Sequence, residues 1–138
     1  RGSSVLILPI HQNELILIKE YAVGSERYEL GFPKGIVDAG ESPEVAANRE
    51  LQEEIGFGAK KLHFLRSLYS SPSHMYGLMH VFIAQDLYPS QLEGDEPEPL
   101  EIVRLPLSEI DRLLADPNFA ESRYLSALFM LREFLCSH

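Results

Sequence analysis

GIVDAGESPEVAANRELQEEIGF, residues 35–57, carries the strongest structural signal in this chain. Ser42 followed by Pro43 marks a helix start, because the serine hydroxyl caps free N–H groups and the fixed φ of proline suits the first turn. Good helix formers follow, and Gly56 is placed to end the helix in a left-handed conformation. The stretch therefore predicts a helix over residues 43–55.

The two faces of this helix differ in chemistry. Its apolar side chains recur at every fourth position and predict a buried stripe formed by Ala47, Leu51 and Ile55. Glu50, Glu53 and Glu54 are spaced three and four apart and share a different face. Arg49 lies one turn before Glu53, so we expect its guanidinium to hydrogen-bond that carboxylate and fix its direction.

Three carboxylates on one helix face repel one another and need an external cation. Hard oxygen ligands suit Mg²⁺ or Mn²⁺, which keep several waters and bridge to substrate phosphates. The alternative is a solvated acidic face that binds nothing. Because Gly35, Glu41 and Arg49 surround the cluster at fixed spacing, we favour the metal site.

The composition predicts one globular domain over residues 1–138. The chain is 45% hydrophobic and 24% charged, with a net charge of −9 and no basic patch that would favour nucleic acid. No apolar run approaches the ~18 residues of a membrane span, and no secretory signal is visible, so we expect a cytoplasmic protein without membrane association. The single cysteine, Cys136, excludes an internal disulfide.

The rest of the chain predicts short strands and two further helices. Apolar runs bounded by turn residues predict strands at 5–9, 15–19, 28–32, 62–70, 78–84 and 102–105, the first two joined as a hairpin. Residues 21–27, 71–74 and 91–99 are expected to be loops. Ser108 is expected to cap a helix that ends near Asp116-Pro117. A second helix over 122–136 is expected to pack its apolar side chains on the sheet: Leu125, Leu128, Phe129, Leu131 and Leu135. This order predicts an α/β fold with a mixed sheet flanked by helices.

The spacing of residues 35–57 matches a known family motif. It reads Gly35, five residues, Glu41, seven residues, Arg49-Glu50-Leu51, one residue, Glu53-Glu54, one residue, Gly56-Phe57. Every fixed position of the Nudix box is filled, so the chain resembles Nudix hydrolases. These enzymes hydrolyse a nucleoside diphosphate linked to another moiety. The resemblance implies the Nudix α/β/α sandwich.

The resemblance also implies roles for individual residues. Glu50, Glu53 and Glu54 would bind the metal, aided by the Lys34 carbonyl, so that one ion activates a water and others neutralise diphosphate oxygens. Arg49, Glu53 and Glu54 would act in catalysis. On the substrate side, Gly35 would let the backbone approach the metal site, and Glu41 would be a helper ligand or a loop brace.

Residues 15–135 further resemble the bacterial hydrolases that cleave ADP-ribose, diadenosine polyphosphates and NADH, within the ADP-ribose pyrophosphatase group. The phrases EYAVGSERYELGFPKG, AQDLYP, LEGDEPEPL and SALFMLREFL carry this similarity. Pro72 lies fifteen residues beyond Phe57, where that group carries a proline, and is read as a substrate contact rather than an ordinary turn proline. His74 beside it is a second candidate, with a surface histidine as the alternative. That group usually has an N-terminal strand region before the core, which this sequence is expected to lack.

An acidic loop is the candidate source of the general base. In the resembled group this base is often a glutamate on a mobile loop late in the chain, and the corresponding stretch here is residues 93–98. Glu98 is the first candidate and Glu96 the second, while a solvated acidic loop is the alternative. If neither acts, Glu53 of the box is the leading choice.

Three functions and one assembly state follow as expectations. The first function is metal-dependent hydrolysis of ADP compounds, and the second is hydrolysis of nucleoside triphosphates or diadenosine polyphosphates with different products. The third is a non-catalytic domain that senses ADP-ribose or NAD, which the intact acidic set disfavours. The resemblance and the apolar residues Leu128, Phe129, Leu131 and Leu135 lead us to expect a homodimer.

Overall fold

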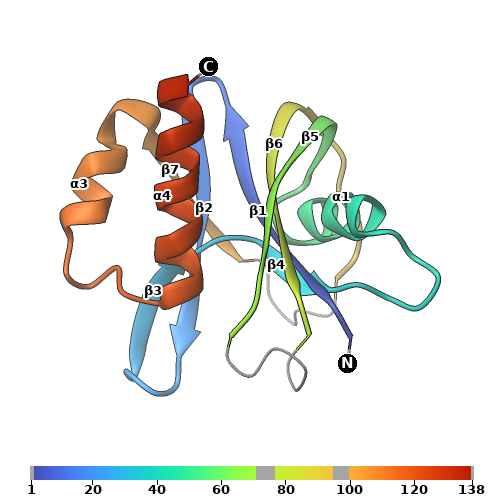
Figure 1. Ribbon diagram of the computed structural model, residues 1–138, viewed down its shortest axis with the longest axis horizontal. Helices are drawn as coiled ribbons and strands as arrows, with labels where there is room; N and C mark the ends of the chain where they lie inside the picture. Colours follow the sequence, from blue (N-terminus) through green and yellow to red (C-terminus); the bar gives the residue numbers. More distant parts are fainter. Residues whose placement is uncertain (1, 71–76, 95–99, 138) are drawn as a thin grey trace.

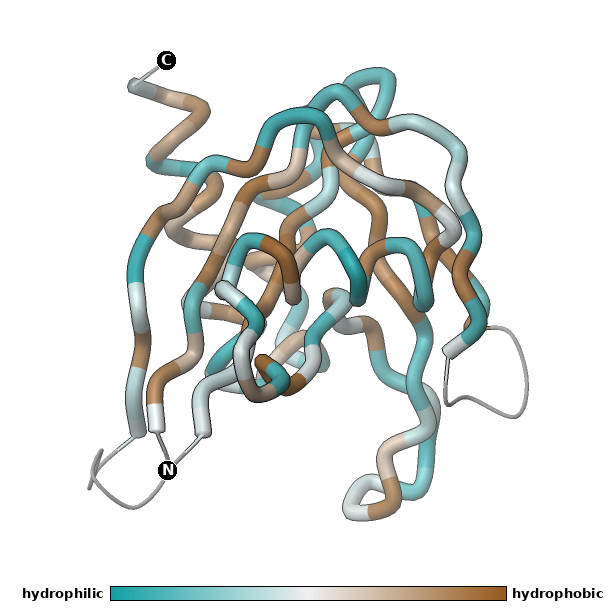
Figure 2. The backbone as a smooth tube through the Cα atoms, turned by 90° about the vertical axis from the view of Figure 1, so that its right-hand side faces the viewer, coloured by the Kyte–Doolittle hydropathy of each residue, from teal (hydrophilic) through white to brown (hydrophobic). Residues whose placement is uncertain are grey.

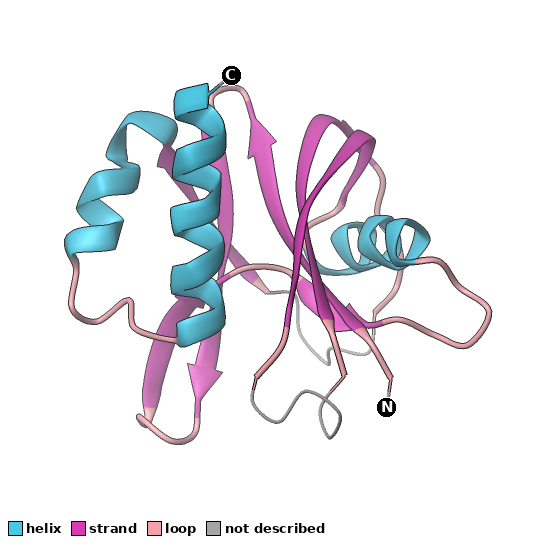
Figure 3. Cartoon of the chain, in the orientation of Figure 1, coloured by secondary structure: helices cyan, strands magenta, loops and turns pink. Residues whose placement is uncertain are grey.

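The computed structural model describes residues 2–70, 77–94 and 100–137. The elements in chain order are β1 (Ser4–His11), β2 (Glu14–Ala22), β3 (Arg27–Gly31), β4 (Lys34–Ile36), α1 (Pro43–Glu54), β5 (Phe57–Leu68), β6 (Met79–Pro89), β7 (Glu101–Pro106), the 3₁₀ helix η1 (Leu107–Glu109), α3 (Ile110–Ala115) and α4 (Ser122–Ser137). The described strands form one sheet, with α3 and α4 on one side and α1 on the other (Figures 1 and 3). The predicted α/β/α sandwich with a mixed sheet is confirmed.

Strand β1 is the centre of the sheet. It pairs antiparallel with β2 at its end, antiparallel with β4 at its start, and parallel with β6 along most of its length. The strand order is β3-β2-β1-β6-β5, with β7 paired to β2. Apolar residues run along these central strands, as the tube in Figure 2 shows.

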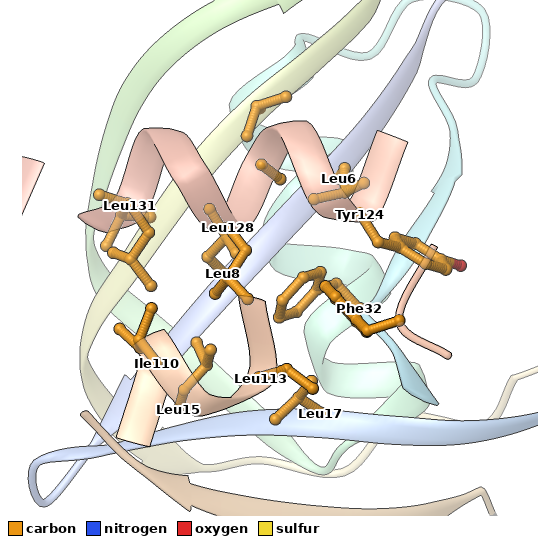
Figure 4. Close-up of a cluster of buried hydrophobic side chains, with 14 residues drawn as sticks. Leu6, Leu8, Leu15, Leu17, Phe32, Ile110, Leu113, Tyr124, Leu128 and Leu131 are labelled. Carbon is orange, nitrogen blue, oxygen red and sulfur yellow. The ribbon is translucent and has the colours of Figure 1, made fainter. Parts of the chain in front are cut away.

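The period of two in the central strands divides their side chains between two cores. Leu6 and Leu8 of β1 join the core under α3 and α4, which Figure 4 shows in close-up. Val5 and Ile7 of the same strand face the core under α1. Because every central strand supplies both cores, the sheet fixes the position of α1 relative to α4.

Helix α1 forms as its local sequence predicts. The Ser42 hydroxyl accepts a hydrogen bond from the Val45 N–H at 3.2 Å, and Gly56 follows the helix at φ +75°. The predicted apolar stripe is buried: Ala47 and Leu51 are fully buried, and Ile55 is 8% exposed. The rest of the helix surface carries polar and charged residues together with the exposed Val45.

Several strands are longer than the sequence predicts. β2 continues to Ala22, so the expected loop is confined to residues 23–26, and Tyr21 instead pairs across the strands with Tyr28. β5 begins at Phe57, five residues before the predicted start at residue 62. Its antiparallel pairing with β6 comprises ten residue pairs and extends to Phe57 opposite Pro89. The short strand β4 is absent from the sequence prediction, since its three residues carry no strand pattern of their own.

Two predictions for the C-terminal helices are wrong. Ser108 caps nothing: it lies inside η1, and α3 begins after Glu109 without a side-chain cap. Phe129 of α4 is 43% exposed and does not pack on the sheet, whereas Leu128 and Leu131 are fully buried there. Tyr124, which the apolar pattern omits, is buried in their core. Across the described residues, no helix has both the length and the apolar character needed to cross a bilayer.

Candidate active site

The site lies where α1 passes β4, and Gly35 determines how closely the two approach. Gly35 pairs with Val5 of β1, which holds its backbone in the sheet. A Cβ added to Gly35 would lie 2.0 Å from Oε2 of Glu50. Only glycine leaves room for the Glu50 carboxylate against the strand, where Glu50 is 9% exposed.

Arg49 connects the loop before α1 to the acidic face of the helix. Its Nη1 donates to Glu50 Oε2 at 2.9 Å and, more weakly, to Glu53 Oε1 at 3.5 Å. Its Nη2 also donates to the Ile36 carbonyl at 3.0 Å. The expected bond to Glu53 is therefore present but long, and Glu50 is the carboxylate that Arg49 holds most closely on the helix.

Glu41 is the second anchor of Arg49. Its two oxygens accept from Nε and Nη2 of Arg49 at 2.8 and 3.0 Å, and Oε1 also accepts from the Asp38 N–H at 3.0 Å. The bond to Arg49 and the backbone bond to Asp38 lower the pKa of Glu41 to about 2. Of the two roles expected for Glu41, these contacts are those of a loop brace.

Glu54 and Glu50 form a close carboxylate pair. Burial, the side-chain hydrogen bond to Glu50 and the charge of Glu50 raise the pKa of Glu54 to about 9. Two neighbouring carboxylates repel each other when both are ionised, so the pair favours a bound cation. Their oxygen atoms are the ligands that a hard divalent cation prefers. Within the described ranges, no three His, Cys, Asp or Glu side chains converge as a ready-made metal cage. The pair of Glu50 and Glu54 fits Mg²⁺ or Mn²⁺ as a partial ligand set, since Mg²⁺ keeps several waters.

Lys34 belongs to a cluster that the sequence does not predict. Its Nζ lies 3.2 and 3.3 Å from the two Glu20 oxygens and donates to the Tyr124 hydroxyl at 2.6 Å. The Tyr124 hydroxyl in turn donates to Glu20 Oε1 at 2.9 Å. These three residues come from β4, β2 and α4, so only the tertiary fold unites them. In the sequence, the one feature that could have indicated this cluster is the acidic Glu20 near the end of an apolar strand, and the structure shows Glu20 partly buried.

The segment after β6 is tied to the end of α1. Leu92 N–H donates to the Gln52 carbonyl at 3.0 Å, and Gln91 Nε2 donates to the carbonyls of Gln52 and Glu53 at 3.0 and 3.3 Å. A Cβ on Gly94 would lie 3.3 Å from Cβ of Glu53. The acidic loop therefore starts beside the carboxylate face. The candidate bases Glu96 and Glu98 lie outside the described residues.

A groove of about 500 Å³ lies between the first turn of α4 and the ends of β5 and β6. Its lining includes Ser4, Tyr69, Ser70, Gly77 and Arg123. Ser4 pairs with Ile36 of β4, and the α4 residues of the lining place the groove on the α4 side of the sheet. The substrate-contact candidates Pro72 and His74, which fall between Ser70 and Gly77, lie outside the described residues.

Comparison with known proteins identifies the family of the chain. Residues 1–129 match the family model described as the NUDIX domain. The chain is 58% identical over 132 residues to the ADP compounds hydrolase NudE of Escherichia coli (strain K12), covering 96% of this chain and 71% of that protein. It is 30% identical over 138 residues to the ADP-ribose pyrophosphatase of Bacillus subtilis (strain 168), covering 97% and 75%.

The fold comparison gives the same relationship. A solved structure described as the crystal structure of ADP compounds hydrolase superposes with a TM-score of 0.92 at 56% identity, covering 99% of this chain and 74% of that one. The α1 segment that places Arg49 against Glu41 and Glu50 is the motif on which the resemblance rested. With the family model spanning nearly the whole chain, the protein belongs to the Nudix hydrolase family.

Proposed function

We propose that this protein hydrolyses the diphosphate linkage of ADP-containing compounds in the cytoplasm and releases AMP. The compounds are ADP-ribose, diadenosine polyphosphates and NADH. The observation that carries the proposal is the carboxylate pair formed by Glu50, which is buried against Gly35, and Glu54, which is partly buried. The names of two relatives, an ADP compounds hydrolase and an ADP-ribose pyrophosphatase, support the substrate class.

The reaction requires Mg²⁺ or Mn²⁺ in this proposal. Glu50 and Glu54 would hold the ion, with Glu53 and the Lys34 carbonyl as further ligands. When bound, such an ion polarises the diphosphate oxygens and makes a bound water more acidic. Arg49 contributes by orienting Glu50, and Glu54 gives up its proton when the cation replaces it.

We place the general base on the acidic loop, with Glu98 first and Glu96 second. The support is the tethering of Gln91 and Leu92 to the carbonyls of α1, which starts this loop beside Glu53. Glu98→Gln is expected to lower kcat by about 10²–10³ with little change in metal affinity. If both Glu98→Gln and Glu96→Gln keep near-normal kcat, the base lies in the box, and Glu53 becomes the leading choice.

We also propose a homodimer without a nucleic-acid partner. Leu128 and Leu131 do not contribute, because they are fully buried within one chain. The support is the β2–β3 hairpin, where Tyr21, Val23 and Tyr28 are 54%, 79% and 69% exposed. A cluster of exposed apolar side chains of this kind is typical of an association surface.

A product assay tests the proposed function. The protein is given ADP-ribose, diadenosine triphosphate and a nucleoside triphosphate in parallel, with Mg²⁺ and then with EDTA. AMP and ribose 5-phosphate from ADP-ribose, lost in EDTA, are the expected result. Glu53→Gln should lower kcat by about 10²–10⁴, whereas Glu44→Gln, an exposed acid of the first helical turn, should not. Turnover of the triphosphate alone, or full activity in EDTA, would contradict the proposal.

A further inference from the structure

Two cations lie beside the carboxylate face, and their hydrogen bonds differ. Arg49 is fully committed, because its guanidinium donates to Glu41, Glu50, Glu53 and the Ile36 carbonyl. Lys34 donates to the Tyr124 hydroxyl at 2.6 Å, but its contacts to the Glu20 carboxylate are long, 3.2 and 3.3 Å, and its side chain is 27% exposed. Lys34 is thus the cation that can exchange or share its partners with an incoming anion.

The position of the Lys34 ammonium is built into the fold. A Cβ on Gly31 would lie 2.7 Å from Cε2 of Tyr124 and 2.8 Å from Oε1 of Glu20, so this glycine makes room for both partners of the lysine. The Tyr124 ring packs edge-to-face on buried Phe32 at 5.8 Å, with its hydroxyl at the margin of the core (Figure 4). Burial and the charge of Glu20 raise the pKa of Tyr124, which keeps the hydroxyl protonated.

The charge of Lys34 also reaches the carboxylate pair. Lys34 directly precedes Gly35, whose Cα lies against the Glu50 carboxylate. Among the charges acting on Glu54, Lys34 favours ionisation, whereas Glu20 and Glu50 oppose it. The ammonium therefore belongs to the electrostatic environment of the carboxylate pair.

We propose that the Lys34 ammonium binds a diphosphate oxygen of the substrate, and that Glu20 and Tyr124 are positioning residues that hold it there. This inference rests on the proposed function, because it assigns a contact for the same diphosphate. In the absence of substrate, Glu20 balances the charge of Lys34 in its partly buried position. On binding, the ammonium spans Glu20 and the phosphate oxygen, while the Tyr124 hydroxyl limits its movement.

Calorimetric binding of a non-hydrolysable methylene-diphosphonate analogue of ADP, at fixed Mg²⁺, tests this contact. Lys34→Met, similar in length but uncharged, should weaken analogue binding about 10- to 100-fold and leave adenosine binding unchanged. Lys34→Arg should recover part of the loss. Tyr124→Phe keeps the ring and its packing on Phe32 but loses the hydroxyl, so it should weaken analogue binding in the same direction and by less.

Lys19→Met is the matched control. Lys19 lies on β2 next to Glu20 and pairs with Glu101 at 3.4 Å, yet it has no contact in the Lys34 cluster. It should bind the analogue as tightly as the unchanged protein. Equal analogue affinity in Lys34→Met, or an equal loss for adenosine and analogue, would overturn the inference.

The two proposals fail in different ways. Turnover of ADP-ribose combined with analogue binding that does not depend on Lys34 would overturn the lysine contact and leave the proposed function intact. Lys34-dependent binding of the analogue without turnover of any ADP compound would support the contact and contradict the proposed hydrolysis.

Discussion

At Glu54, the protein holds a carboxyl group where ionisation is unfavourable. Between the usual pKa of 4.5 and the folded value of about 9, the folded protein keeps a proton that the unfolded chain has released. The folded state is then favoured at low pH, and this contribution is lost as the pH rises towards 9. A divalent cation replaces the proton and should remove this dependence on pH.

Thermal unfolding measured by circular dichroism checks this linkage. In EDTA, the Tm should fall by several degrees between pH 6 and pH 8.5, and saturating Mg²⁺ should remove the fall. Glu54→Gln should flatten the dependence in EDTA, since its amide does not titrate. An equal fall in the Gln variant would show that another group is responsible.

Arg49 holds its partners through the fixed, planar geometry of its guanidinium group as well as through its charge. Arg49→Lys keeps one positive charge but cannot hold both Glu41 oxygens and Glu50 at once. We expect kcat to fall about 10- to 100-fold with KM nearly unchanged, because Arg49, in our proposal, orients metal ligands and makes no contact with substrate. Steady-state kinetics on ADP-ribose measure both constants. A variant that mainly raised KM would place Arg49 against the substrate instead.

At the scale of elements, the contact between β4 and α1 depends on one missing side chain. Gly35→Ala introduces a Cβ 2.0 Å from Glu50 Oε2, so Glu50 must leave its place against the strand. We expect Mn²⁺ affinity, measured by titration calorimetry, to fall about 10- to 100-fold. Gly24→Ala is the control, because its added Cβ would meet nothing within 4 Å. Unchanged Mn²⁺ binding in Gly35→Ala would exclude Glu50 as a ligand in this position.

Elements with local signals could be predicted, and those made by pairing could not. Helix α1 has its serine cap, its apolar stripe and its terminal glycine within fifteen residues, so its limits were predicted to within one residue. Strand β4 exists because β1 pairs with it, and nothing in Lys34-Gly35-Ile36 indicates this. Ser108 fits the sequence pattern of a helix cap, but it lies inside the 3₁₀ helix η1 and α3 begins only after Glu109.

The site divides in the same way. Spacing along one helix predicted that Glu50, Glu53, Glu54 and Arg49 would lie together. The bond between Arg49 and Glu41 was not predicted. Glu41 lies in a loop of irregular backbone before α1, where residue spacing does not indicate which side chains meet. Glu20 and Tyr124 lie 104 residues apart in sequence, and only the packing of α4 on the sheet brings them to Lys34.

At the scale of the whole molecule, the exposed hairpin predicts association. Light scattering at micromolar concentration should give about twice the 15.6 kDa mass of the chain. Val23→Asp should return the mass to that of a monomer, since a charge on the 79% exposed Val23 opposes an apolar contact. Val45→Asp, on α1 and 57% exposed, should keep the dimer. A monomer mass for the unchanged protein would contradict the proposal.

The parallel pairing of β1 with β6 has a consequence for synthesis on the ribosome. Ser4 pairs with Met79, so β1 leaves the exit tunnel well before the partner that occupies one of its edges. At about 5–20 residues per second, the apolar β1–β2 hairpin waits for several seconds with that edge open. Nascent chains of this protein should therefore depend on chaperone protection until β6 has been translated, and clustered rare codons between β2 and β6 should lower its soluble yield.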